Sequence, residues 1–142
     1  MSETDYERAA ARYCNDDGNP PLNSALEAGD EEAANILLDG GDNPNLIDDL
    51  GYNALHWAAM KHCSILLLLK ILGKIENVNA QSSCPTRHCY GSTALMLAAG
   101  NNYLDIVIEL MNHPKINLNV QHPEDNETAL HYAVGEDHPA IL

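Results

Sequence analysis

The sequence contains no Phe and has 5% aromatic residues, so Leu, Ile, Val and Ala must build its core. Such small and aliphatic side chains suit closely packed helices. Basic residues are also scarce, because 7 Lys+Arg stand against 21 Asp+Glu and the formal net charge is −14. Binding to a phosphate backbone requires clustered positive charge, so direct nucleic-acid binding is excluded and an anionic membrane surface is disfavoured as a partner. A hydrophobic fraction of 45% is too high for a disordered acidic tail.

Long apolar runs are missing as well. The Leu-rich run from Ile65 to Leu69 ends at Lys70, far short of the roughly 20 residues of a membrane span. The polar, acidic start lacks the basic region and apolar run of a signal peptide. The 4 Cys are not needed as a disulfide frame in a chain of 142 residues, so we expect reduced thiols. These features predict a monomeric protein of the cytoplasm or nucleus, with no membrane association.

The charge is unevenly distributed along the chain. Residues 1–50 carry −11, residues 51–104 carry +3 and residues 105–142 carry −6. The simplest interpretation is a set of solvated helix faces. The alternative is a partner-binding surface with acidic outer parts and a mildly basic middle.

Internal repetition decides the predicted fold. Four similar segments, each a helix-starting residue followed by small apolar residues, place a Leu at 22, 55, 95 and 130, with intervals of 33, 40 and 35 residues. About eleven residues after each Leu comes a second apolar stretch. In the first three units a turn-rich segment ending in Asn follows, at residues 40–45, 77–79 and 117–119. Each unit therefore predicts a helix, a tight turn, a second helix and an extended loop.

This register resembles the ankyrin repeat, with its period of about 33 residues and its Thr-Pro-Leu-His-x-Ala signature. The resemblance implies an all-α solenoid of helix-turn-helix units joined by extended β-hairpin-like fingers. It covers residues 15–142 as units of about 15–48, 49–81 and 82–121, with a partial unit at 122–142. Residues 1–14 form an N-terminal extension or a capping helix, starting at Ser2 or Thr4 and ending near Tyr13.

Departures from the signature predict where the repeats are held less tightly. In the family, the Thr hydroxyl and the His imidazole tie a unit to its own loop. Thr128 and His131 keep that pair, whereas Asn23 replaces the His in the first unit and Met96 replaces it in the third. We therefore expect the first and third units to be less tightly tied.

The interval of 40 residues indicates an insertion of about seven residues, most of it within the finger 81–90. This finger carries Arg87 and His88 in the net-positive part of the chain. Loops on a rigid scaffold often carry recognition, so the finger is a candidate contact. A tolerated insertion without a role is the alternative, because long surface loops cost little.

Catalysis and metal binding have weak support. His62 and Cys63, together with the run from Cys84 to Cys89 that includes His88, offer thiol and imidazole groups. A zinc site would need four converging ligands, and no second matching pair is present. No nucleophile stands on a recognisable strained turn, and no glycine-rich phosphate loop is found. We expect neither an enzyme nor a cofactor, and keep a metal- or redox-regulated finger as an alternative.

The resemblance implies an adaptor or inhibitor that binds another protein through its finger tips and inner-helix ends. Because acidic residues dominate the outer units, we expect a partner with basic patches. Trp57 and Tyr132 occupy the same position of the repeat. The sequence is equally compatible with burial in the core and with contact to a partner at this position. The expected contacts are Asp49, Leu50, Tyr52, Trp57, Met60, Lys61, Arg87, His88, Tyr90, Ser92, Asn101, Glu124, Asp125, Glu127 and Tyr132.

Two narrower expectations come from the same resemblance. The segments 51–56, 66–69 and 77–81 are similar to the ankyrin half of NF-kappaB precursors and inhibitor-of-kappaB proteins, which implies a Rel-type transcription factor as the partner. In the family, a finger Asn eight residues after a Leu can be hydroxylated. Asn45 follows Leu37 at that interval, and Asn79 follows Ile71 with a poorer match.

Overall fold

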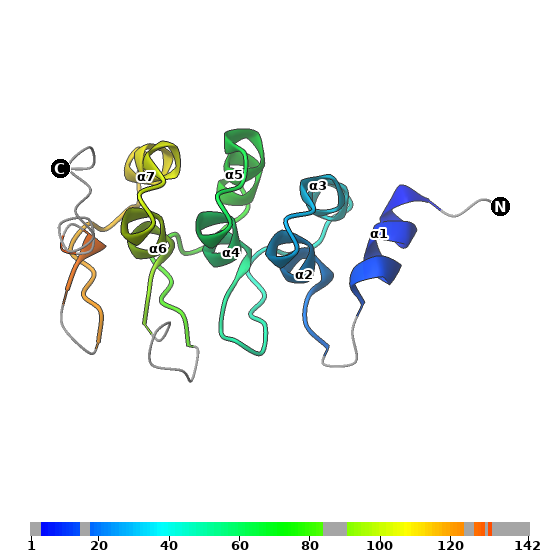
Figure 1. Cartoon of the computed structure of the whole chain (residues 1–142), viewed down its shortest axis with the longest axis horizontal. Helices are drawn as coiled ribbons and strands as arrows, with labels where there is room; N and C mark the ends of the chain where they lie inside the picture. Colours follow the sequence, from blue (N-terminus) through cyan, green and yellow to red (C-terminus); the bar gives the residue numbers. More distant parts are fainter. Residues whose placement is uncertain (1–3, 15–17, 84–90, 124–126, 130, 132–142) are drawn as a thin grey trace.

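Pairs of short helices stand side by side along the chain in the computed structural model, which describes residues 4–14, 18–83, 91–123, 127–129 and 131. This part of the chain contains helices and no strand, and the helices form a row in chain order (Figure 1). None of these helices has the length and apolar character needed to cross a bilayer. Their bounds are α1 Asp5–Tyr13, α2 Pro21–Glu27, α3 Glu31–Asp39, α4 Ala54–Met60, α5 Ile65–Leu72, α6 Ala94–Gly100 and α7 Leu104–Met111.

Polar residues fix where most helices begin. The first turn of a helix leaves backbone N–H groups without a partner inside the helix, and a side-chain oxygen at the N-cap satisfies one of them. In α1 this oxygen belongs to Thr4, which accepts from the N–H of Glu7. The expected capping helix therefore starts after Thr4. Equivalent caps begin α3, α4, α5 and α6 at Asp30, Asn53, Ser64 and Thr93.

The core runs as one layer between the inner helices α2, α4 and α6 and the outer helices α3, α5 and α7. Each inner helix packs on the next inner helix, and each outer helix on the next outer helix. Helix α1 packs on α2 and α3 and so covers the end of the row. The predicted aliphatic core is confirmed by the largest fully buried side chains, which include Leu22, Leu37, Leu38, Leu55, Leu67, Leu68, Ile71, Ile106 and Leu110.

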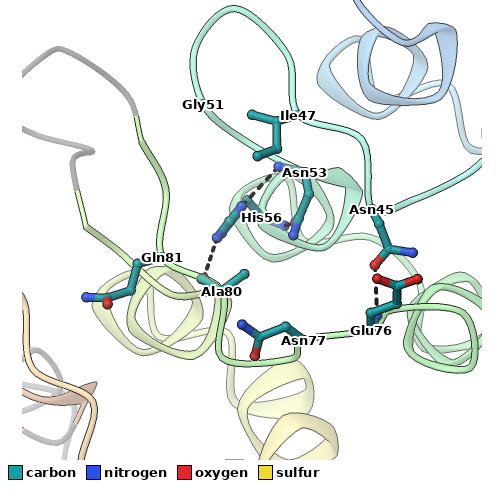
Figure 2. A pocket seen from close by; sticks show the side chains of 9 residues that line it. All are labelled: Asn45, Ile47, Gly51, Asn53, His56, Glu76, Asn77, Ala80 and Gln81. Atoms are coloured by element: carbon teal, nitrogen blue, oxygen red, sulfur yellow. Dashed lines mark hydrogen bonds between the residues drawn. The ribbon is translucent and has the colours of Figure 1, made fainter.

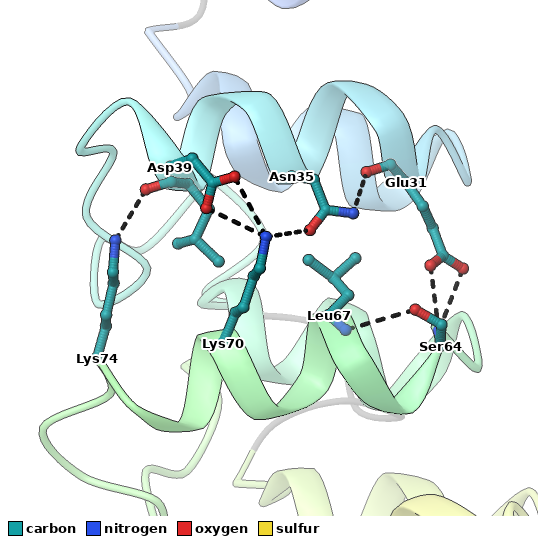
Figure 3. A network of polar contacts seen from close by, with 8 residues as sticks. Glu31, Asn35, Asp39, Ser64, Leu67, Lys70 and Lys74 are labelled. Carbon is teal, nitrogen blue, oxygen red and sulfur yellow. Dashed lines mark hydrogen bonds and ion pairs between the residues drawn. The ribbon is translucent and has the colours of Figure 1, made fainter.

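Polar contacts also join neighbouring outer helices on their exposed side (Figure 3). The carboxylate of Glu31 on α3 accepts from the N–H of Ser64 at 3.2 Å. The ammonium of Lys70 on α5 lies 3.1 Å from the Asn35 side-chain oxygen and 3.2 Å from the Asp39 carboxylate. These contacts fix the register of α5 against α3 at little energetic gain, because exposed ion pairs contribute about 0–1 kcal/mol.

Asparagines link the turn segments that follow the outer helices α3, α5 and α7. The side chain of Asn45 donates to the Lys74 carbonyl at 3.0 Å and accepts from the Glu76 N–H at 2.8 Å. One unit further on, Asn79 repeats the pattern with the Lys115 carbonyl at 2.9 Å and the Asn117 N–H at 2.7 Å. Each unit is thus bonded to the next through an amide that both donates and accepts.

The fingers are hairpin-like loops, as expected, although none of their described parts is long enough to be a strand. The N–H of Asp48 donates to the Tyr52 carbonyl at 3.0 Å, and the N–H of Ser82 donates to the Ser92 carbonyl at 2.8 Å. In the second finger, residues 84–90 lie outside the described part. The base of that finger is nevertheless closed in the same way as the base of the first.

Candidate protein-interaction surface

The tip of the first finger is organised by a single carboxylate, that of Asp48. One of its oxygens accepts from the N–H groups of Leu50 and Tyr52, both at 3.0 Å. The other accepts from the indole N–H of Trp57 at 2.6 Å. A side chain that accepts from its own loop holds the turn in one conformation. The tip is therefore preorganised, which lowers the entropy that binding would cost.

Three expected contact residues are buried in this region. Tyr52 and Trp57 expose 4% and 6% of their surfaces, and their rings meet edge to face at 5.1 Å. Ser92 exposes 5%, and its N–H donates to the Ser82 hydroxyl at 3.1 Å. The rings of Tyr52 and Trp57 hold the first finger against α4, and all three residues leave little surface for a partner. Trp57 is thus packed in the core, which is one of the two roles that the sequence left open for it.

Other expected contacts are exposed. Asp49 and Leu50 lie at the finger tip, and Lys61 and Asn101 follow the ends of α4 and α6. Met60 is half-buried at the end of α4. Helix α4 has seven residues, which at the usual rise separates the finger base from Lys61 by about 10 Å. A single partner domain can therefore reach both places.

Asp49 is held in position by the preceding loop. Its N–H donates to the Asn19 side-chain oxygen at 2.8 Å, and its carboxylate accepts from the Asn19 amide at 3.0 Å. Sequence reasoning missed both Asn19 and Asp48 as positioning residues. An Asp three residues before Gly51, in a turn, was the signal that could have identified Asp48.

Several expected contacts lie outside the described residues and stay predictions. They are Arg87, His88, Tyr90, Glu124, Asp125 and Tyr132. Cys84 and Cys89 lie there too. Glu127, next to this group, is partly buried.

His56 shows how the signature His works in this chain (Figure 2). Its Nδ1 accepts from the N–H of Asn53 at 3.0 Å, so its Nε2 carries the proton and donates to the Ala80 carbonyl at 2.9 Å. Burial lowers the pKa of His56 below its ordinary value of 6.5, which keeps the ring neutral. The ring closes a loop and borders a cavity of 160 Å³ lined also by Asn45, Ile47, Gly51, Asn53, Glu76, Asn77, Ala80 and Gln81.

Asn23, which stands in place of the signature His in the first unit, still bonds to a loop. Its buried amide donates to the Tyr52 carbonyl at 3.0 Å and to the Leu46 carbonyl at 3.4 Å. The amide therefore donates to a loop as the His56 imidazole does in the second unit, but its buried Oδ1 has no hydrogen-bond partner, so the accepting contact of His56 is missing. In the third unit Thr93 still caps the helix at the Met96 N–H, but the Met96 side chain has no N–H to donate to a loop.

His62 and Cys63, which offer an imidazole and a thiol, make other contacts. The His62 ring stacks on Tyr103 at 4.2 Å, and its Nε2 lies 2.9 Å from the Asp105 carboxylate. Burial raises the pKa of the Cys63 thiol to about 12, so this sulfur is not a thiolate at neutral pH. Among the described residues, no three His, Cys, Asp or Glu side chains converge as metal ligands.

The predicted hydroxylation positions Asn45 and Asn79 occupy equivalent places. Both are half-buried, and both use their amides in the links between units. Modification at either position stays a prediction.

Comparison with known proteins agrees with this architecture. A profile of ankyrin repeats in three copies matches residues 6–82 and again residues 67–142. The chain is 37% identical over 71 residues to the phosphocholine transferase AnkX of Legionella pneumophila, which covers 50% of this chain and 7% of that protein. It is 32% identical over 66 residues to the putative palmitoyltransferase ZDHHC13 of Danio rerio, covering 46% and 10% respectively.

The chain belongs to the ankyrin-repeat family. Ankyrin repeats are protein-interaction modules, and the repeat is in general not catalytic. The chain spans at most a tenth of the length of the two relatives, so the transferase activities in their names describe those larger proteins.

Proposed function

We propose that the chain is a non-catalytic adaptor or inhibitor that binds a protein with basic patches through its finger tips and inner-helix ends. The observation that carries this proposal is the finger 48–52, which Asp48 holds in one conformation while Asp49 and Leu50 are exposed. An exposed carboxylate beside an exposed aliphatic side chain on a rigid turn suits a basic, partly apolar partner surface. A net charge of −14 would steer such a partner toward the chain.

The resemblance to inhibitor-of-kappaB proteins suggests one specific partner. A Rel-type transcription factor would offer basic DNA-binding and nuclear-import surfaces, which an acidic repeat array could mask. The experiment below includes such a factor as one purified probe beside partners captured from lysate.

The test compares three baits in quantitative affinity capture: the parent, the finger variant Asp49→Ala/Leu50→Ala and the control Glu76→Ala/Leu118→Ala. The control removes one exposed acid and one exposed Leu that are not part of the finger 48–52. The control bait should capture a true partner as well as the parent does. The finger variant should bind that partner at least about tenfold more weakly, as expected for hot-spot residues. Equal capture by all three baits would contradict the proposal.

Kinetics with the captured partner test the electrostatic part. Raising the salt concentration should slow association much more than it speeds dissociation, because long-range attraction between exposed charges is screened. Association rates that do not change with salt would remove the basic partner from the proposal.

A further inference from the structure

A second surface stands out on the outer helices α5 and α7, which lie on the other side of the inner helices from the fingers (Figure 1). Leu66 and Leu69 of α5 are 77% and 47% exposed, and Ile108 of α7 is 47% exposed. We call these three side chains the outer-helix patch. A single exposed Leu is ordinary, but exposed apolar side chains gathered on two packed helices are a feature that marks interaction sites.

The fold itself does not require apolar residues at these positions. The buried residues of the three outer helices define one shared register, with Ala33, Ala34 and Leu37 in α3, Leu67, Leu68 and Ile71 in α5, and Ile106, Val107 and Leu110 in α7. In that register, Glu32 of α3 corresponds to Leu66 and Asn35 corresponds to Leu69. The first unit thus forms the same helix with polar side chains where the second unit exposes two leucines.

A missing neighbour does not explain the exposure of the two leucines. Helix α5 packs on α3 at one side and on α7 at the other. Leu66 and Leu69 remain exposed although both neighbours are in place.

Charge beside the patch indicates what it would bind. Lys70 of α5 reaches back to Asn35 and Asp39 of the preceding helix. The corresponding residue of α7 is Glu109, and the residues of α5 that correspond to Asn35 and Asp39 are Leu69 and Gly73. The repeat register therefore offers the Glu109 carboxylate no cationic group, and within the described residues no ion pair joins it to a basic side chain.

We propose that the outer-helix patch is a second docking surface, which takes the apolar face of a partner helix carrying Lys or Arg beside that face. The aliphatic face covers Leu66, Leu69 and Ile108, and a basic side chain meets Glu109. Two copies of a chain with a net charge of −14 repel each other, and an anionic lipid surface repels it equally, so neither matches this surface. The inference is independent of the proposed function, because it uses neither the fingers nor the inner helices.

The test uses a display library of helical peptides with randomised surface positions as the probe. Peptides are selected on the parent chain and counter-selected on Leu66→Glu/Leu69→Asn, which gives α5 the residues that α3 already holds at these positions. The matched control is Leu46→Asn, the same change at a Leu with 50% exposure outside the outer helices. Circular dichroism and thermal melting verify that each variant is folded, and Ile108→Asn replaces the double variant if it is not.

We expect the selected peptides to combine an apolar face, spaced i, i+3 or i+4 and i+7, with Lys or Arg beside it. They should bind the double variant at least about tenfold more weakly than the parent, and bind the Leu46→Asn control unchanged. Glu109→Gln should weaken binding and reduce its salt dependence. These results do not depend on whether Asp49→Ala/Leu50→Ala loses capture of the finger-binding partner.

Three results would overturn the inference. The first is selected peptides that lack basic residues or an apolar helical face. The second is equal binding to the parent and the double variant. The third is self-association of the parent in sedimentation that the double variant abolishes, which would make a second copy the occupant.

Discussion

At the scale of single residues, polar side chains in this protein act mainly by holding backbone groups of loops. Asp48 satisfies two N–H groups of its finger and the Trp57 indole, and Asn23 satisfies two loop carbonyls. Removing one partner of a buried hydrogen bond leaves the other group unsatisfied, which costs about 1–3 kcal/mol. The loops that present the candidate contacts therefore depend on residues other than those contacts.

The first prediction concerns Asp48. Asp48→Ala should lower the free energy of unfolding by about 1–3 kcal/mol, because the Trp57 indole and two N–H groups lose their acceptor. Urea denaturation followed by fluorescence of Trp57 measures the change. The control is the exposed neighbour, Asp49→Ala, for which we expect a change within about 0.5 kcal/mol. Equal losses for the two variants would show that the Asp48 contacts do not organise the finger.

The second prediction concerns pH and His56. Burial lowers the pKa of His56 in the folded state, so below about pH 6.5 the unfolded chain binds a proton that the folded chain does not. Stability should therefore fall as the pH is lowered from 6.5, with a slope of at most about 1.4 kcal/mol per pH unit for this group.

The measurement compares unfolding of the parent and His56→Asn between pH 7.5 and 5.5, roughly one unit either side of the ordinary pKa. The variant places the residue of the first unit, Asn23, at the same position of the second and removes one titrating group. Its stability should depend less on pH than that of the parent. Parallel pH profiles would mean that His56 titrates equally in both states.

At the scale of elements, the helix pairs could be predicted from the sequence because each unit repeats the same apolar register. The caps at Asn53 and Thr93 and the buried face of α5 follow from residue type and spacing alone. The role of Trp57 could not be predicted, since an aromatic residue at that position can pack inward or face a partner. Its direction depends on Asp48, and no sequence rule gives the distance between those two side chains.

The third prediction separates the polar and apolar contacts between α3 and α5. Lys70→Met should change the free energy of unfolding by less than about 1 kcal/mol, because the ammonium and its Asp39 partner are both exposed to solvent. Leu67→Ala should cost about 2–5 kcal/mol, because Leu67 is fully buried. Chemical denaturation in low and high salt measures both. A larger loss for Lys70→Met would mean that ion pairs hold the outer helices together.

At the scale of the whole molecule, the described helices pack mainly on their neighbours in the row. The stability of such an array is a sum of unit terms and interface terms. Because the units repeat, part of the candidate surface could be predicted from the sequence. The repeat register located its exposed residues, such as Asp49 and Lys61, but it could not show that Tyr52 and Ser92 are buried at the finger bases.

The fourth prediction concerns opening of the array. Amide hydrogens of α4 and α5, which have a helix pair on each side, should exchange more slowly than those of α1, which packs on α2 and α3 alone. Native-state hydrogen exchange with mass spectrometry resolves these helices. Leu68→Ala serves as the control. It should raise the exchange rates of α4 and α5 toward the rate of α1. Uniform exchange across all described helices would indicate one cooperative unit.

The closure of the finger bases has a consequence for engineering. Asp48 with Tyr52, Ser82 with Ser92 and His122 with Glu127 make the same backbone bond, although the paired residues lie four, ten and five positions apart. The chain between the paired residues can vary in length without disturbing the stacked helices. The second finger is therefore a natural graft site, where foreign peptide sequences can be displayed on an unchanged scaffold.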